Sequence, residues 1–147
     1  MSDQVRVSLK EVEGYRFENM FAGGGAPLVT DEPPPLGEGA GPSPSQLLTA
    51  AVANCLCASL RFALQKFHQD ASPLTAEATA TIERNAHQRL RVGRIEVVLQ
   101  LGRPASEIAH LDRILASFED YCTVSQSVAQ GLPVLTSVVD IHGVRCK

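Results

Sequence analysis

The order of hydrophobic and polar residues predicts three strands ahead of a long connection. Residues 5–11 alternate apolar and polar side chains with a period of two, and residues 15–21 are rich in aromatic strand formers. The glycines of "AGGGAP", residues 22–27, can adopt positive φ and suit a hairpin turn before the short run "LVT". Residues 31–44 contain five prolines and therefore predict an irregular surface connection.

A long helix is predicted from Pro44 to about His68. Ser43 supplies a capping hydroxyl, and Pro44 suits the first helical position because no amide donor is needed there. Apolar positions then extend almost all round the helix: Leu47, Leu48, Ala51, Val52, Ala53, Leu56, Leu60, Phe62, Ala63, Leu64 and Phe67. A helix of this kind is expected to be buried centrally.

The rest of the chain predicts a hairpin, two helices and a final strand. Residues 74–86 and 90–102 alternate and form the antiparallel hairpin, while residues 105–121 carry apolar side chains at helical spacing. A short helix follows Cys122, and "PVLTSVVDIHG" closes the chain as a strand. We therefore expect a single α+β domain over residues 1–147, with antiparallel sheet covering helices.

Composition and charge exclude few classes of binding partner. With 147 residues, 44% hydrophobic and 20% charged, the chain is typical of one globular domain. A net charge of -3 gives no long-range attraction to nucleic acid or to an anionic membrane. Four arginines lie on the predicted hairpin among acidic residues, which indicates a solvated face rather than the alternative, a nucleic-acid patch: Arg84, Arg89, Arg91 and Arg94.

The N-terminal residues and the cysteines predict a compartment. The start of the chain lacks the basic and apolar parts of a signal peptide, and no uninterrupted apolar run approaches the roughly 20 residues that span a bilayer. We expect a soluble cytoplasmic protein whose four cysteines are normally reduced, so that a functional disulfide would be transient.

Two cysteines in the long helix cannot act together. Cys55 and Cys57 are two positions apart, about 200° around a helix, so they point apart and can neither pair nor share a metal ion. The histidines at 68, 87, 110 and 142 have none of the spacings of zinc sites, and we expect no metal or cofactor. Cys57 is interpreted as a packing residue and Cys146 as an exposed thiol.

Cys122 has a different setting. Thr123 and Gln126 have the spacing of a capping box, which puts Cys122 immediately before a helix N-terminus. Unpaired amide donors at such a place favour thiolate over thiol, so a lowered pKa and greater reactivity are expected there. The alternative is a small residue packed at a turn.

Two segments around these cysteines resemble one protein family. "GPSPSQLLTAAVANCL" resembles the "G-x-N/S-P-E-x-L-L-x-A-A-x-x-x-C" helix opening of the OsmC and organic hydroperoxide resistance family, and "CTVSQSVAQGLPV" resembles its second signature, "C-P-V-S-x-x-L". The separation of the two cysteines and the order of elements are also similar. The resemblance implies an OsmC-like fold, with antiparallel sheets wrapped around long central helices, in an intertwined homodimer with active sites at the subunit interface.

The same resemblance implies a peroxidase with two cysteines. Cys55 would attack the distal peroxide oxygen and become a sulfenic acid, which Cys122 would resolve into a disulfide. Regeneration would need a dithiol donor, such as a lipoyl group on a carrier protein. The sequence departs from the family in having Ser45 where a glutamate holds the catalytic arginine; Arg6 and Arg16 are the arginines of the N-terminal region, and neither follows the family's local pattern.

Two other functions stay open at this point. One is a non-catalytic dimer of the same fold that binds an apolar ligand at its interface, with the cysteines kept as core residues. The other is a general thiol-disulfide redox protein, in which Cys122 would be the more reactive cysteine. The ligand-binding dimer differs from the peroxidase because its Cys55 would not react with peroxide.

Overall fold

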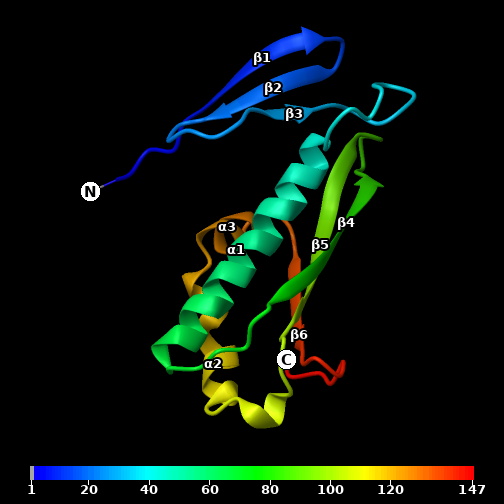
Figure 1. Ribbon diagram of the computed structural model, residues 1–147. Helices are drawn as coiled ribbons and strands as arrows, with labels where there is room; N and C mark the ends of the chain where they lie inside the picture. Colours follow the sequence, from blue (N-terminus) through cyan, green and yellow to red (C-terminus); the bar gives the residue numbers. More distant parts are fainter. Residues whose placement is uncertain (1) are drawn as a thin grey trace. The chain divides into compact units, whose positions relative to one another are not determined.

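The computed structural model describes residues 2–147 and divides into two compact units, Met1–Leu47 and Leu48–Lys147. The prediction of a single domain stays a prediction. The helices and strands follow in this order (Figure 1): β1 Val7–Glu13, β2 Arg16–Phe21, β3 Leu28–Thr30, α1 Pro44–Lys66, β4 Thr75–Arg84, β5 Leu90–Gln100, the 3-10 helix η1 Ala105–Glu107, α2 Leu111–Ser117, the 3-10 helix η2 Phe118–Tyr121, α3 Thr123–Val128 and β6 Val134–Val139. The mixed α+β class predicted from the sequence is confirmed.

The first unit contains an antiparallel sheet of three strands in the order β1-β2-β3. The turn between β2 and β3 uses Gly23, Gly24 and Gly25, all at positive φ, as the sequence predicted. The β1 strand is exposed along its whole length, including the apolar side chains of Val7, Leu9 and Val12. This sheet therefore leaves hydrophobic surface uncovered within the single chain.

The proline-rich connection is organised by one buried carboxylate. Asp31 accepts hydrogen bonds from the backbone N–H groups of Glu32 (2.8 Å), Glu38 (3.2 Å) and Ala40 (3.0 Å). The N–H of Ala40 is the main reason that the pKa of Asp31 lies below its ordinary value. A segment without regular secondary structure thus satisfies its backbone donors on a side chain.

Helix α1 has a complete cap at each end. At its start the backbone N–H of Ser43 donates to the side chain of Gln46 (2.9 Å), and the backbone N–H of Gln46 donates to the hydroxyl of Ser43 (3.3 Å). This reciprocal pair is a capping box. At its end His68 takes a left-handed conformation, and the N–H of Gln69 donates to the carbonyl of Leu64. The predicted bounds of the helix are confirmed.

The central burial expected for α1 is only partly present in the single chain. One face is buried, namely Val52, Leu56, Ser59, Leu60, Ala63 and Leu64. The opposite side is exposed, and Phe62 retains 46% of its surface. By length and composition α1 could cross a membrane, but core helices of soluble proteins meet the same criterion.

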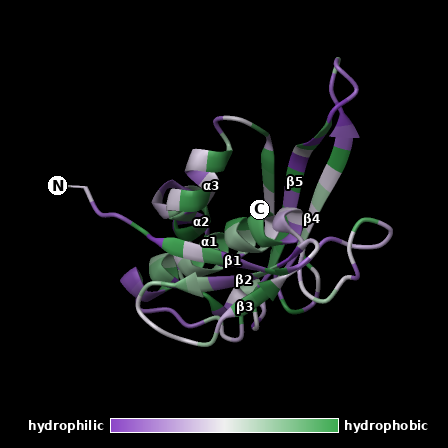
Figure 2. Cartoon of the chain, turned by 90° about the horizontal axis from the view of Figure 1, so that it is seen from above, coloured by the Kyte–Doolittle hydropathy of each residue, from purple (hydrophilic) through white to green (hydrophobic). Residues whose placement is uncertain are grey.

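The second unit contains a mixed sheet in the order β4-β5-β6. Hydrophilic and hydrophobic residues follow one another along β4 and β5 (Figure 2), which pair antiparallel as predicted. The expectation of a purely antiparallel sheet is wrong for the last strand, because β6 pairs with β5 in parallel, from Ile95↔Val134 to Gln100↔Val139. Parallel neighbours need a crossover connection, and residues 101–133 supply it with their short helices.

The single helix predicted for residues 105–121 is instead three short ones. Ile108 is extended (φ -110, ψ 109) and His110 is left-handed (φ 58), so η1 cannot continue into α2. The backbone N–H of Ala109 donates to the side chain of Gln69 rather than to a helical carbonyl. A contact from a distant residue thus replaces the local hydrogen bond that the periodicity predicted.

These elements enclose one hydrophobic core in the second unit. Its fully buried members come from α1, β5, the crossover and β6: Val52, Leu56, Leu60, Ile95, Val97, Leu99, Leu101, Ile114, Phe118, Cys122 and Val138. Cys55, Cys57 and Cys146 pack against this core while keeping some exposure. The core therefore has thiols at its margin as well as inside it.

Candidate functional site

Two cysteines that are far apart in sequence meet at the edge of the core. Cys55 lies in the middle of α1, and Cys122 lies at the start of α3. The Cys122 side chain lies close enough to the Cys55 thiol to raise its pKa, and both thiols are free. Cys122 has no exposed surface, whereas Cys55 is partly exposed. The pair singled out from the sequence thus lies close together, with one member accessible from outside.

Cys122 is held in place because it caps α3. Its backbone is extended (φ -86, ψ 95), and its sulfur accepts a hydrogen bond of 3.4 Å from the N–H of Ser125. The capping box predicted between Thr123 and Gln126 is wrong: Thr123 is already helical, and the Gln126 side chain donates to the carbonyl of Glu119 (3.1 Å). The helix itself begins directly after Cys122, as predicted.

The surroundings of Cys55 oppose its ionisation. Burial is the main cause that raises the pKa of its thiol above the ordinary value, and contact with the Cys122 side chain raises it further. The backbone N–H groups of Val124 and Ser125 act in the opposite direction and lower this pKa, because amide donors favour the thiolate. In the described part of the chain no cation contributes to this shift. Apart from the predicted helix start, no motif in the sequence indicated a role for these two amides.

The other two cysteines are separate from this pair. Burial raises the pKa of the Cys57 thiol, and its side chain packs against the core, in agreement with the packing role expected for it. Cys146 was expected to be exposed, but it is partly buried against the core and its thiol donates to the carbonyl of Val144 at 3.5 Å. The reason is that the backbone of the chain end pairs with β6: the N–H of Cys146 donates to the carbonyl of Val138 at 2.7 Å.

The N-terminal arginines make their contacts inside the first unit. Arg16 forms an ion pair with Glu38 (Nη2 to Oε2, 2.7 Å), and its Nε lies 4.0 Å from a carboxylate oxygen of Asp31. Arg6 donates to the side chain of Gln4 at 3.2 Å. Ser45 lies in the first turn of α1. Arg16 of β2 is thus paired with two acidic side chains of the proline-rich connection.

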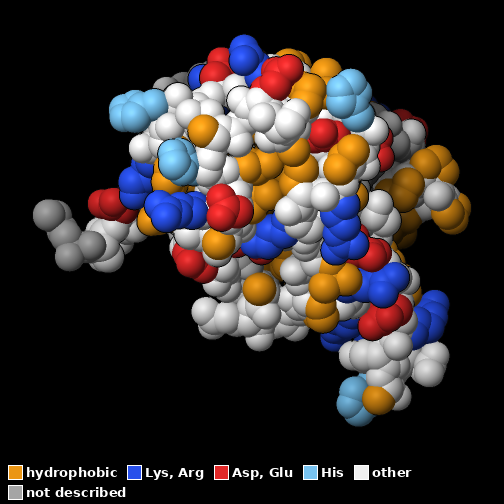
Figure 3. All heavy atoms as spheres, turned by 90° about the horizontal axis from the view of Figure 1, so that it is seen from below, with side chains coloured by type: hydrophobic (Ala, Val, Ile, Leu, Met, Phe, Trp, Pro, Cys, Tyr) orange, Lys and Arg blue, Asp and Glu red, His pale blue; other side chains and the backbone are white. Residues whose placement is uncertain are grey.

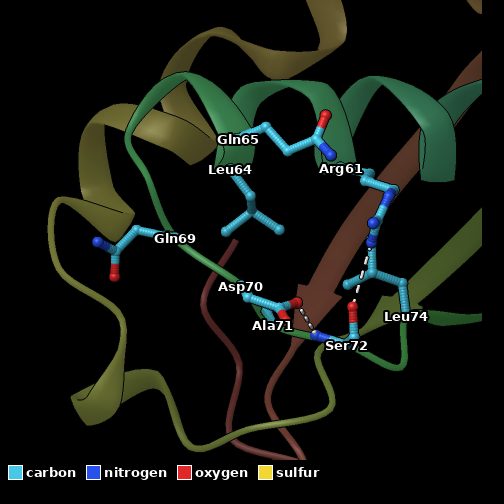
Figure 4. Close-up of a pocket in the computed structure, with 8 residues that line it drawn as sticks. All are labelled: Arg61, Leu64, Gln65, Gln69, Asp70, Ala71, Ser72 and Leu74. Carbon is cyan, nitrogen blue, oxygen red and sulfur yellow. Dashed lines mark hydrogen bonds between the residues drawn. The ribbon is translucent and has the colours of Figure 1, made fainter.

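A small hollow at the C-terminal end of α1 contains no cysteine (Figure 4). It measures about 200 Å³, below the roughly 300–1,000 Å³ of ordinary ligand sites. Its charged groups both bond Ser72: Arg61 donates to the hydroxyl of Ser72 (3.1 Å), and the N–H of Ser72 donates to Asp70 (2.9 Å). We interpret it as a surface hollow with its polar groups already partnered.

The arginines of the β4-β5 hairpin also make local contacts. Arg84 donates to the carbonyl of Gln88 and Arg91 to that of Leu90, both at 2.7 Å, and Arg94 pairs with Glu96 at 3.3 Å. On the face of the molecule in Figure 3, Lys and Arg side chains lie among Asp and Glu side chains. Among residues 2–147, His, Cys, Asp and Glu form no group of three or more that could hold a metal ion.

Comparisons with known proteins bear on this thiol pair. The profile of the OsmC-like protein family matches residues 37–137, a range that contains both cysteines. No curated protein matches the sequence.

Solved structures with the same fold cover nearly the whole chain. An OsmC-like protein of unknown function from Vibrio cholerae is 15% identical with a TM-score of 0.79, covering 94% of this chain and 100% of that one. The organic hydroperoxide resistance protein OhrB of Bacillus subtilis is 15% identical with a TM-score of 0.68, covering 92% and 98%. An organic hydroperoxide resistance protein OsmC from Legionella pneumophila is 16% identical with a TM-score of 0.71, covering 92% and 96%.

Proposed function

Because the chain belongs to the OsmC-like protein family, we propose that it is a thiol-dependent peroxide reductase in which Cys55 reacts with the peroxide and Cys122 resolves the product. The observation that carries this proposal is the proximity of the two thiols, with Cys122 inside the core and Cys55 packed against it. Structures of similar fold that are named for organic hydroperoxide resistance support the same reaction class.

The proposed chemistry has two steps on the protein. The Cys55 thiolate attacks the distal oxygen of a hydroperoxide ROOH, the O–O bond breaks, and the alkoxide leaves as ROH after taking a proton. Cys55 is then a sulfenic acid. The thiolate of Cys122 attacks the Cys55 sulfur, an S–S bond forms, and the hydroxyl leaves as water after protonation. A dithiol donor, such as a lipoylated protein, then reduces the disulfide.

The exposure of the two thiols supports this order of events. Cys55 is partly exposed and can meet a small peroxide, while Cys122 is fully buried and can react only with a partner already inside the fold. A general thiol-disulfide exchange protein would need Cys122 to meet an external partner first. The burial of Cys122 therefore favours the peroxidase over that alternative.

The proposal includes a homodimer. The first sheet exposes apolar side chains along β1, and α1 exposes a whole side, including Phe62. Exposed apolar surface of this kind marks association sites, and a second copy of the chain is the partner that we propose. Light scattering should give twice the 15.7 kDa of one chain at micromolar concentration, and a stable folded monomer would contradict this part of the proposal.

One feature favours a second function, an apolar ligand site. A concavity of about 390 Å³ in the first unit lies within the range of ligand sites. Its lining is largely apolar: Leu9, Tyr15, Phe17, Asn19, Thr30, Glu32, Pro44 and Leu47. On this alternative the protein would be a non-catalytic dimer whose cysteines are core residues, and Cys55 would not react with peroxide.

The deciding experiment is mass spectrometry of the reduced protein after one equivalent of cumene hydroperoxide, an organic hydroperoxide. We expect one disulfide between Cys55 and Cys122 in the wild type and in Cys57→Ser, the matched control. Cys122→Ser should stop at a trapped sulfenic acid, and Cys55→Ser should consume no peroxide. Consumption at the wild-type rate by Cys55→Ser, or none by the wild type with any dithiol donor, would favour the ligand-binding function.

The compartment and the partners are proposed on chemical grounds. Proteins of this family are soluble, and we propose that this one works in the cytoplasm, where glutathione and thioredoxin keep cysteines reduced between turnovers. All four cysteines are free in the structure. The proposal requires a peroxide and a dithiol donor as partners, and it assigns no role to nucleic acid, membrane, metal or cofactor.

A further inference from the structure

The ammonium group of Lys147 makes three contacts with the segment that leads to Cys122. Its Nζ donates to the carbonyl of Leu115 at 2.7 Å and pairs with a carboxylate oxygen of Glu119 at 2.6 Å. The same atom lies 5.0 Å from the centre of the Phe118 ring, within the range of a cation-π contact. Leu115 is in the last turn of α2, where carbonyls have no partner within the helix. One charge thus holds both α2 and η2.

The backbone of Lys147 is itself fixed on the sheet. Its N–H donates to the carbonyl of Val138, and its carbonyl accepts from the N–H of Val138, both at 3.1 Å. Val138 is a fully buried residue of β6. The side chain of Lys147 therefore connects the sheet to η2.

Glu119 contacts both Lys147 and Cys122. Its carboxylate binds Lys147, while its carbonyl accepts hydrogen bonds from the N–H of Cys122 (3.0 Å) and from the side chain of Gln126 (3.1 Å). Glu119 is thus bound to Lys147 through its carboxylate and to the start of α3 through its carbonyl. The side chains of Lys147 and Glu119 are only about one third exposed (34% and 28%), which reduces the screening of their ion pair by water.

We propose that Lys147 is a positioning residue for the resolving step, an inference that rests on the proposed function and adds to it. Lys147 acts through Glu119, since its ammonium group contacts Leu115, Glu119 and Phe118 rather than either reacting sulfur. It keeps the segment from Phe118 to Cys122 in the place where the Cys122 side chain lies near Cys55. When Cys55 is a sulfenic acid, the Cys122 thiolate attacks its sulfur, and the hydroxyl leaves as water with a proton. Small displacements of reacting groups slow such steps strongly.

The test separates the first oxidation from the resolving step. In Lys147→Gln, the rate of Cys55 oxidation by cumene hydroperoxide should stay within about twofold of the wild type, because Lys147 does not act on Cys55. Formation of the Cys55–Cys122 disulfide should slow by about tenfold, and dimedone should trap correspondingly more sulfenic acid. Both rates would be followed by quenched flow and mass spectrometry.

Two further variants control for a merely structural effect. Arg94→Gln removes an exposed ion pair with Glu96 on β5, and it should change neither rate. Lys147→Arg keeps the charge and should restore most of the disulfide rate. If Lys147→Gln proves too unstable to purify, Glu119→Gln removes the same ion pair and should show the same selective slowing. Equal slowing of both steps, or an unchanged disulfide rate in Lys147→Gln, would overturn the inference.

A peroxide-independent oxidant distinguishes this inference from the proposed function. Diamide takes two electrons from two thiols and is itself reduced to the hydrazine, so it forms the Cys55–Cys122 disulfide without a sulfenic acid. If the wild type reacts with diamide but not with hydroperoxide, the peroxidase proposal fails. The positioning role then stands if Lys147→Gln slows the diamide reaction relative to Arg94→Gln, and it falls if the two variants react alike.

Discussion

The raised pKa of Cys55 predicts how its reactivity depends on pH. Burial, followed by contact with the Cys122 side chain, raises this pKa above the ordinary thiol value of about 8.5. At pH 7 a thiol with a pKa of about 8.5 is roughly 3% thiolate, so Cys55 should be below about 3%. The rate of its reaction should therefore rise nearly tenfold per pH unit from about pH 6 to 8, or close to a hundredfold in all.

The pH dependence of Cys55 reactivity can be measured by alkylation with iodoacetamide. The alkylated Cys55 peptide is quantified by mass spectrometry at each pH. Cys122→Ala removes a side chain that raises the pKa of Cys55, so its profile should move to lower pH and its rate at pH 7 should increase. Cys57→Ala is the matched control and should leave the profile of Cys55 unchanged. A wild-type rate that reaches a plateau below about pH 7.5 would show a lowered pKa and refute the reasoning.

The same shift has a consequence for stability. Because the folded-state pKa of Cys55 is raised, the folded protein keeps this proton at pH values where the unfolded chain has lost it. The contribution of this protonated thiol to the free energy of unfolding is fully present below the pKa that Cys55 has in the unfolded chain. It is lost as pH rises through the pKa that Cys55 has in the folded protein. Denaturation by urea should therefore become easier above about pH 8.5 in the wild type, and less so in Cys55→Ser.

Two further predictions concern packing and the cap of α3. Gly102→Ala would drive its Cβ into the backbone of Ser72 and should lower the free energy of unfolding by about 1–3 kcal/mol in urea titrations. Gly131→Ala, whose nearest atom is a carbonyl oxygen 3.8 Å away, should change it by less than about 0.5 kcal/mol. A disulfide at Cys122 takes away the sulfur that caps α3, so hydrogen exchange in residues 123–128 should be faster in the oxidised protein; equal exchange would argue against this capping role.

The features that the sequence predicted well depend on local interactions. Ser43 and Pro44 mark the start of α1 because capping is decided within one helical turn, and the alternation in β4 and β5 reflects one buried face. Cys122 could be selected because it lies directly before a helix start, whereas Cys55 was distinguished from Cys57 of the same helix only by the resemblance to the family motif.

The features that sequence-based prediction missed depend on contacts between distant residues. An alternating strand can pair in either direction, so nothing in residues 134–139 indicated that β6 would lie parallel to β5. The break near His110 involves the Gln69 side chain, which lies far away in sequence. The roles of Glu119 and Lys147 likewise depend on the chain end returning to β6, and neither residue belongs to a motif.

The parallel pairing of β5 and β6 has a consequence for the order in which the protein is made. The pairing closes a loop over residues 101–133, a costlier contact than the β4-β5 hairpin, and it requires residues that emerge from the ribosome after Cys122. A nascent chain therefore presents Cys55 on its helix before Cys122, the resolving cysteine of our proposal, is anchored beside it. During that interval a sulfenic acid at Cys55 would have no partner, and further oxidation to the irreversible sulfinic acid would compete. Newly synthesised chains should thus be the ones most easily lost under oxidative stress.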